Sequence, residues 1–196
     1  MRTFFKALAA GTVAAMVLSF CHFNALCGDI RQGVVRLHVL AHDDTREEQT
    51  LKLAVRDAVL LAADGLLDGV QDTAGALDAV TAALPQLTAA ANACLREQGS
   101  THTAAVTLEP AYFTTRTYDA GTLPAGWYNA LRVVIGDGAG RNWWCVVFPP
   151  LCLSSAVKPA RLDDVLETPA CEVVENAPRY EVRFKLVEWV TGWFGR

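Results

Sequence analysis

The residues with the clearest capacity for covalent chemistry are Cys145 and Cys152, which flank an apolar run that ends at Pro149-Pro150. A thiolate beside a histidine base is a nucleophile, whereas two cysteines of an exported protein form a structural disulfide. A cysteine inside an apolar strand behaves as a small hydrophobic group, and proline ends a strand. We therefore expect a sharp turn that pairs Cys145 with Cys152 in a disulfide. A bond between Cys94 and Cys171 stays open, because connectivity does not follow from sequence.

Histidines offer a second kind of chemistry, and the four in this chain stand at positions 22, 38, 42 and 102. The sequence contains no H-E-x-x-H or C-x-x-C spacing, so it predicts no metal site and no cofactor. His38 shares one face of a predicted strand with Arg36, where a structural histidine is more common than a base or a ligand. No catalytic residue is predicted.

The glycines of Gly136-x-Gly138-x-Gly140 are spaced as in a phosphate-binding loop. Such a loop leads into a helix whose amino terminus faces the phosphate, and its P-loop form carries a Lys-Ser/Thr pair. Here the glycines stand between two predicted strands, and the pair is missing. A tight hairpin connection explains them better than nucleotide binding.

The amino terminus predicts export. Arg2 and Lys6 precede an uncharged apolar run from Ala7 to Phe20, which is the order of a signal peptide. The run is short for a membrane span, which needs about 20 residues, and extension through Cys27 would give a poor anchor. We expect either cleavage near Ala25 to Gly28 or retention as an anchor.

The composition fits one globular domain with a core and accessory segments, since 52% of the 196 residues are hydrophobic and 19% are charged. The net charge is −4 and no basic block is present, which argues against a nucleic-acid partner.

Hydrophobic periodicity predicts one strand and then two helices in the first half of the body. Residues 34–41 alternate as a strand. A helix over residues 46–67 follows, with Thr45 as its cap and an exposed ionic ladder of Glu48, Lys52 and Arg56. The second helix, over residues 73–98, contains Pro85, which should kink or split it.

The second half changes to strands, predicted over residues 104–108, 112–118, 127–135 and 142–148, the last two as a hairpin. The fold class is therefore α+β, with two helices packed on one face of a largely antiparallel sheet, and with a signal helix before it and a short carboxy-terminal helix after it. The predicted divisions are a signal peptide or anchor (1–28), an α+β core (29–153), an irregular arm (154–178) and a terminal strand and helix on the core or the membrane (179–196).

Several stretches, in this order, resemble the stage II sporulation protein R family. They are RLHVLA (36–41), EQTLKLAVRDAV (48–59), LPAGWYNALRV (123–133), NWWCVVFPPLC (142–152) and RFKLVE (183–188). The Trp-Trp-Cys block is the most specific of them. The chain departs from the family pattern at His42-Asp43, where that pattern usually reads Asn-Ser.

This resemblance implies a signalling protein rather than an enzyme. Members of the family are made in the forespore of endospore-forming Firmicutes and exported into the space between the two sporulation membranes. There they trigger a membrane-embedded aspartic protease of the mother cell, which cleaves the pro-form of sporulation sigma factor E. The resemblance assigns no activating residues.

Activation by an exported protein requires an exposed surface that the protease binds, and we expect at least one group of tryptophans to be exposed. The candidate partner-binding residues are Arg36, His38, Arg56, Asp57, Asn142, Trp143, Trp144, Trp189 and Trp193. The carboxy-terminal aromatics could also lie in a membrane interface. Two other functions stay open: a secreted hydrolase with a Cys145 or His/Asp site, and a cell-envelope binding domain without a signalling role.

Overall fold

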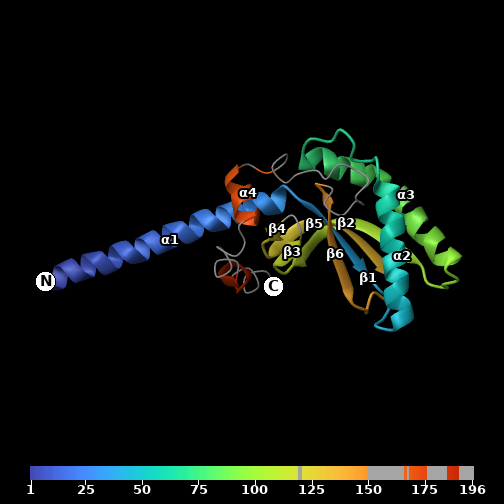
Figure 1. Cartoon of the computed structure of the whole chain (residues 1–196), viewed down its shortest axis with the longest axis horizontal. Helices are drawn as coiled ribbons and strands as arrows, with labels where there is room; N and C mark the ends of the chain where they lie inside the picture. Colours follow the sequence, from blue (N-terminus) through green and yellow to red (C-terminus); the bar gives the residue numbers. More distant parts are fainter. Residues whose placement is uncertain (119–120, 150–165, 167, 176–184, 190–196) are drawn as a thin grey trace. The chain divides into compact units, whose positions relative to one another are not determined.

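The computed structural model describes residues 1–118, 121–149, 166, 168–175 and 185–189 (Figure 1). Two compact units divide the chain. The first unit contains residues 1–31, 113–126 and the segments from residue 166 onward, and the second contains residues 32–112 and 127–165. The divisions predicted at residues 28, 153 and 178 stay predictions.

Helix α2 (Arg46–Ala63) of the second unit begins where its capping residues predict. The Thr45 side chain accepts a hydrogen bond from the backbone N–H of Glu48 at 3.4 Å. The helix ends at Ala63 rather than at Leu67, because Asp64 is an extended C-cap residue and Gly65, with a φ of +79°, continues the turn away from the helix.

Helix α3 (Thr73–Glu97) begins at its N-cap Asp72 and continues past Pro85 as one helix. Of the two effects predicted for Pro85, a kink or a split, the split does not occur. A proline inside a helix costs about 3 kcal/mol, which the burial of neighbouring side chains can offset. Ala83 and Leu87, on either side of the proline, are both buried.

The sheet of the second unit contains β1 (Val35–Leu40), β2 (Ala104–Phe113), β5 (Gly126–Ile135) and β6 (Asn142–Phe148), in the order β2-β5-β1-β6. Strand β1 pairs in parallel with β5 and antiparallel with β6. The α+β prediction is confirmed, with a mixed sheet of four strands. The predicted hairpin between β5 and β6 is wrong, because β1 lies between these two strands.

One face of this sheet is covered by α2 and α3 (Figure 1). Strand β1 contributes Val35, Leu37 and Val39 to the core on that side, as its alternation predicts. The ionic ladder predicted on α2 is wrong at Lys52, whose side chain is 4% exposed. Lys52 Nζ donates instead to Gln49 Oε1 at 2.6 Å and to the carbonyl of Arg141 at 3.0 Å.

The glycines between β5 and β6 let this connection cross closely over the end of β1. The backbone N–H groups of Ala139 and Gly140 donate to the carbonyls of His42 and Ala41, each at 3.0 Å. A Cβ atom on Gly140 would lie 2.1 Å from the carbonyl oxygen of Asp43. The crossing therefore has no room for a side chain at residue 140.

The first unit contains α1 (Arg2–Gln32), an antiparallel pair formed by β3 (Arg116–Tyr118) and β4 (Gly121–Leu123), and α4 (Thr168–Glu175). Helix α4 packs on β4, and a Cβ atom on Gly121 would lie 2.5 Å from Val174 Cγ1. This helix corrects part of the arm predicted to be irregular. Its Pro169 stands in the first helical turn, where proline is tolerated. Residues 185–189 are also helical.

Candidate functional site

The candidate residues of β6 are divided between the two faces of the sheet. Successive side chains of a strand point to opposite faces. Trp143 pairs with Val39 in the register and shares its helix-covered face, whereas Trp144 pairs with His38 on the other face. The nine predicted contact residues therefore do not form one surface.

The face without α2 and α3 contains Arg36, His38, Asn142 and Trp144. His38 Nε2 lies 2.8 Å from Asn142 Oδ1, and its ring centroid lies 6.0 Å from that of Trp144. Arg36 is fully buried, with its guanidinium carbon 4.8 Å from the ring centroid of Tyr128. Arg36 is therefore held inside the protein, and His38 has a hydrogen-bonding partner, which is compatible with the structural role predicted for it.

Burial is the main cause of a lowered pKa at His38, and the nearby charges of Arg132 and Arg36 lower it further. The hydrogen bond with Asn142 acts in the opposite direction. Both arginines disfavour a second positive charge on this face. The neutral imidazole is therefore the favoured form of His38.

Three of the other candidates form a compact group at the surface, here called the Trp143–Arg56 patch: the exposed Trp143 and Asp57 and the half-buried Arg56. The guanidinium carbon of Arg56 lies 4.4 Å from the Trp143 ring centroid, and Arg56 Nη2 lies 2.7 Å from Asp57 Oδ1. Trp143 is 38% exposed. The aspartate fixes the arginine, and the arginine covers one face of the indole, so the three side chains hold one arrangement.

Sequence reasoning missed two exposed apolar side chains, one beside this patch on α2 and one on β5. Leu61 stands one helical turn after Asp57 on α2 and is 76% exposed. Trp127 on β5 is 50% exposed, with its ring centroid 5.9 Å from that of Tyr112. Alternation along β5 could have indicated that Trp127 faces away from Tyr128, which is buried.

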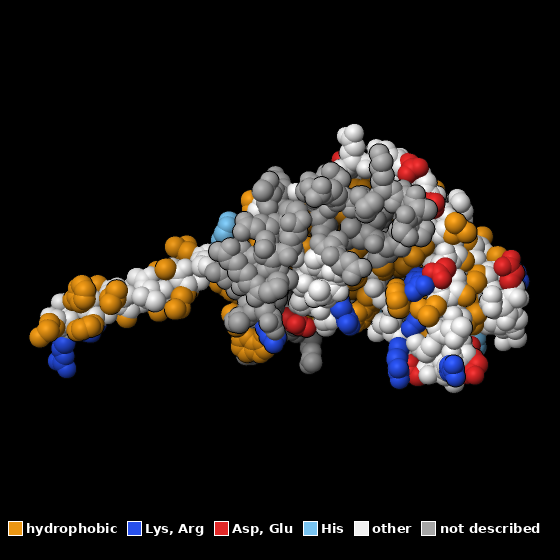
Figure 2. Space-filling model, viewed as in Figure 1, with side chains coloured by type: hydrophobic (Ala, Val, Ile, Leu, Met, Phe, Trp, Pro, Cys, Tyr) orange, Lys and Arg blue, Asp and Glu red, His pale blue; other side chains and the backbone are white. Residues whose placement is uncertain are grey.

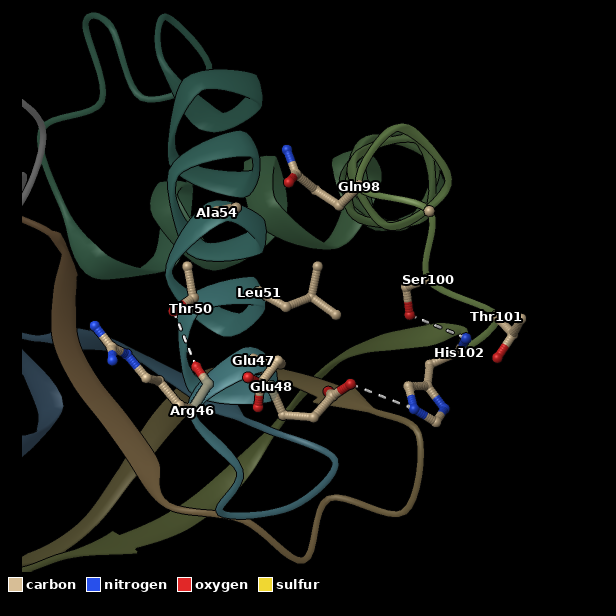
Figure 3. A pocket seen from close by; sticks show the side chains of 11 residues that line it. Arg46, Glu47, Glu48, Thr50, Leu51, Ala54, Gln98, Ser100, Thr101 and His102 are labelled. Atoms are coloured by element: carbon tan, nitrogen blue, oxygen red, sulfur yellow. Dashed lines mark hydrogen bonds and ion pairs between the residues drawn. The ribbon is translucent and has the colours of Figure 1, made fainter.

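A pocket of about 540 Å³ lies between α2 and the turn that follows α3 (Figure 3). Glu48 reaches across it to His102, with Glu48 Oε1 3.5 Å from His102 Nε2. The His102 ring stacks on His42 at a centroid distance of 4.0 Å. Ser100 Oγ accepts a hydrogen bond from the backbone N–H of His102, not from its imidazole. The imidazole points toward Glu48 (Figure 3). A carboxylate–imidazole pair without a hydroxyl or thiol on the imidazole gives no support to hydrolytic chemistry here.

Cys145 forms a disulfide bond, so its sulfur is not available as a thiolate nucleophile. The predicted partner, Cys152, lies outside the described residues, and the pairing stays a prediction. Among the described cysteines, Cys21, Cys27 and Cys94 are free thiols. The described part of the chain contains no group of three or more His, Cys, Asp or Glu side chains that could hold a metal ion.

Of the two carboxy-terminal candidates, Trp189 lies within the described residues and Trp193 lies outside them. Trp189 is 63% exposed, in the first unit. Exposure of Trp127, Trp143 and Trp189 satisfies the condition that at least one group of tryptophans is accessible.

Comparison with known proteins gives a consistent result. The family model of stage II sporulation protein R matches residues 31–158. Stage II sporulation protein R of Bacillus subtilis (strain 168) is 31% identical over 181 residues, which cover 82% of this chain and 81% of that protein. No solved structure matches the chain significantly.

Proposed function

Because the chain belongs to the stage II sporulation protein R family, we propose that it is an exported sporulation signal that activates a membrane-embedded aspartic protease of the mother cell. It acts from the space between the forespore and the mother cell. The activated protease then processes the pro-form of sigma factor E. The match over residues 31–158 is the observation that carries this proposal, because it includes the whole four-stranded sheet and both of its helices.

The proposal makes the protein a ligand rather than a catalyst. Two observations support this assignment: Cys145 is disulfide-bonded, and His38 is neutral and hydrogen-bonded. A ligand changes the activity of its target by binding the active form more tightly than the resting form. A tenfold preference corresponds to about 1.4 kcal/mol, which a few well-placed contacts supply.

The Trp143–Arg56 patch is the contact that we propose for the protease. Tryptophan and arginine are the residue types most enriched where binding energy concentrates. Trp143 and Arg56 are held together at 4.4 Å on a sheet edge and a helix, so few degrees of freedom are lost on binding. The exposed Leu61 extends the same stripe of α2 with apolar area.

Reconstitution tests this function. Vesicles that contain the protease and the sigma-factor precursor are incubated with and without the purified chain, and the cleaved product is quantified over time. We expect cleavage to rise on addition of the chain. An unchanged rate, at concentrations where the chain is folded by circular dichroism, would remove the proposed function.

A further inference from the structure

Helix α1 has two parts with different surroundings. Residues 1–19 are exposed on every side, and the helix shows hydrophobic side chains along its free length (Figure 2). The large apolar side chains in this part are each more than half exposed: Phe4, Phe5, Leu8, Val13, Met16, Val17 and Leu18. The sequence motif accounts for the hydrophobicity, but the structure adds that the first unit covers none of these side chains.

The last third of the same helix belongs to the core of the first unit. Phe23, Cys27 and Ile30 are each at most 1% exposed. Arg31 Nη1 donates to the carbonyl of Ala125 at 3.3 Å.

We infer that α1 is retained as a membrane anchor whose first part lies in a lipid bilayer. A signal peptidase cut between Ala25 and Gly28 would detach the buried Phe23 from the unit and expose its binding place. It would also break a helix that is continuous from Arg2 to Gln32. Of the two outcomes predicted for this segment, cleavage near residue 28 or retention, the burial of Phe23 and the continuity of the helix favour retention.

A bilayer is the occupant that fits the exposed part. Apolar side chains lie all round the helix, whereas a protein groove would cover one stripe. An 18-residue window of the helix has a mean hydropathy of 1.8, and none of its residues is buried. A helix of 18 residues is roughly 27 Å long, close to the roughly 30 Å thickness of the hydrocarbon core. Lys6 extends its charged end toward the headgroups, and the basic Arg2 keeps the amino terminus in the cytoplasm.

The buried part begins at Phe23, only a few residues after the exposed part ends. The anchor therefore holds the first unit at the membrane surface on the exported side. This inference concerns how the chain is attached and goes beyond the proposed function. It does not depend on protease activation, so each can fail without the other.

The test uses the full chain with a carboxy-terminal epitope, produced in a bacterial host with an active signal peptidase. The recovered chain is weighed by intact mass spectrometry, and its membranes are washed with alkaline carbonate. The matched control is Cys27→Ala, which completes an Ala-x-Ala cleavage motif with Ala25 and marks the position of a product cut before Gly28.

We expect the wild-type chain to retain its first helix in the measured mass and to stay in the carbonate-washed membrane pellet. External protease should digest the body of the chain in spheroplasts but not in intact, sealed inverted vesicles. A shortened wild-type chain that starts anywhere from residue 20 to residue 29 would overturn the inference. A full-length chain that carbonate releases would overturn it equally.

Discussion

The guanidinium carbon of Arg56 lies 4.4 Å from the ring centroid of Trp143. The two residues come from α2 and from the edge strand β6, and 87 positions separate them in sequence. Asp57 holds the arginine from the other side at 2.7 Å. A charged side chain stacked on a half-exposed indole makes a rigid, accessible surface, and our account of binding rests on it.

The contact between Arg56 and Trp143 predicts a measurable coupling in stability. We expect a double-mutant cycle of Arg56→Ala and Trp143→Ala to give about 0.5–1 kcal/mol, the range for cation–π pairs at exposed sites. Urea unfolding of the four proteins measures it. Strictly additive effects of the two substitutions would show that the pair contributes nothing.

Gly140→Ala should be strongly destabilising, because the new Cβ atom would lie 2.1 Å from the carbonyl oxygen of Asp43. We expect a loss of at least about 3 kcal/mol in the free energy of unfolding, since backbone rather than a flexible side chain must move. Gly69→Ala is the matched control. It meets open space and suffers only the strain of a φ of +77°, about 1–2 kcal/mol. Equal losses in the two variants would contradict the close crossing over β1.

His38 predicts a pH dependence of stability with a definite sign. Burial lowers its folded-state pKa below the ordinary 6.5, so the unfolded chain binds more protons at and below that pH. The free energy of unfolding should therefore fall as pH decreases from about 6.5 toward the lowered pKa. We expect His38→Gln to reduce the difference between urea unfolding at pH 7.5 and at pH 5. The same difference in both proteins would contradict the assignment. His42→Gln, at a partly buried histidine in the loop after β1, is the comparison.

The disulfide of Cys145 predicts a covalent link that peptide mapping without reductant can identify. We expect the partner to be Cys152, in a loop of eight residues. Reduction should then lower the free energy of unfolding by about 2–3 kcal/mol, as chain entropy estimates for a loop of that size. A peptide that joins Cys145 to Cys171 would contradict the pairing.

Local patterns predicted most elements of the second unit. Thr45 and Glu48 marked the start of α2, and alternation in residues 34–41 marked β1 and its buried face. A helix cap depends on residues three positions apart, and a half-buried strand shows apolar residues at every second position. Both patterns can be seen directly in a sequence. The described strand β6 coincides with the predicted range of 142–148.

Local sequence patterns could not predict the order of the strands in the sheet or the contacts between residues far apart in the sequence. A glycine-rich link between two strands predicts a hairpin, yet β1 is inserted between β5 and β6 by a parallel pairing across about 90 residues. Lys52 was predicted on the exposed side of α2, and its acceptor at Arg141 comes from that same distant link. For the site, the contact residues were predicted by type, but their division between two faces depends on the register of β6 with β1.

The most direct test of the account measures cleavage of the sigma-factor precursor by the reconstituted protease against the concentration of added chain. Wild type, Trp143→Ala and Trp127→Ala are compared, since Trp127 is an exposed tryptophan on β5 outside the patch. We expect saturable activation by wild type and by Trp127→Ala. For Trp143→Ala we expect a concentration for half-maximal activation about tenfold or more higher, as for loss of a residue that contributes at least about 1.4 kcal/mol to binding. No activation by the folded wild-type chain at any concentration would contradict the central claim.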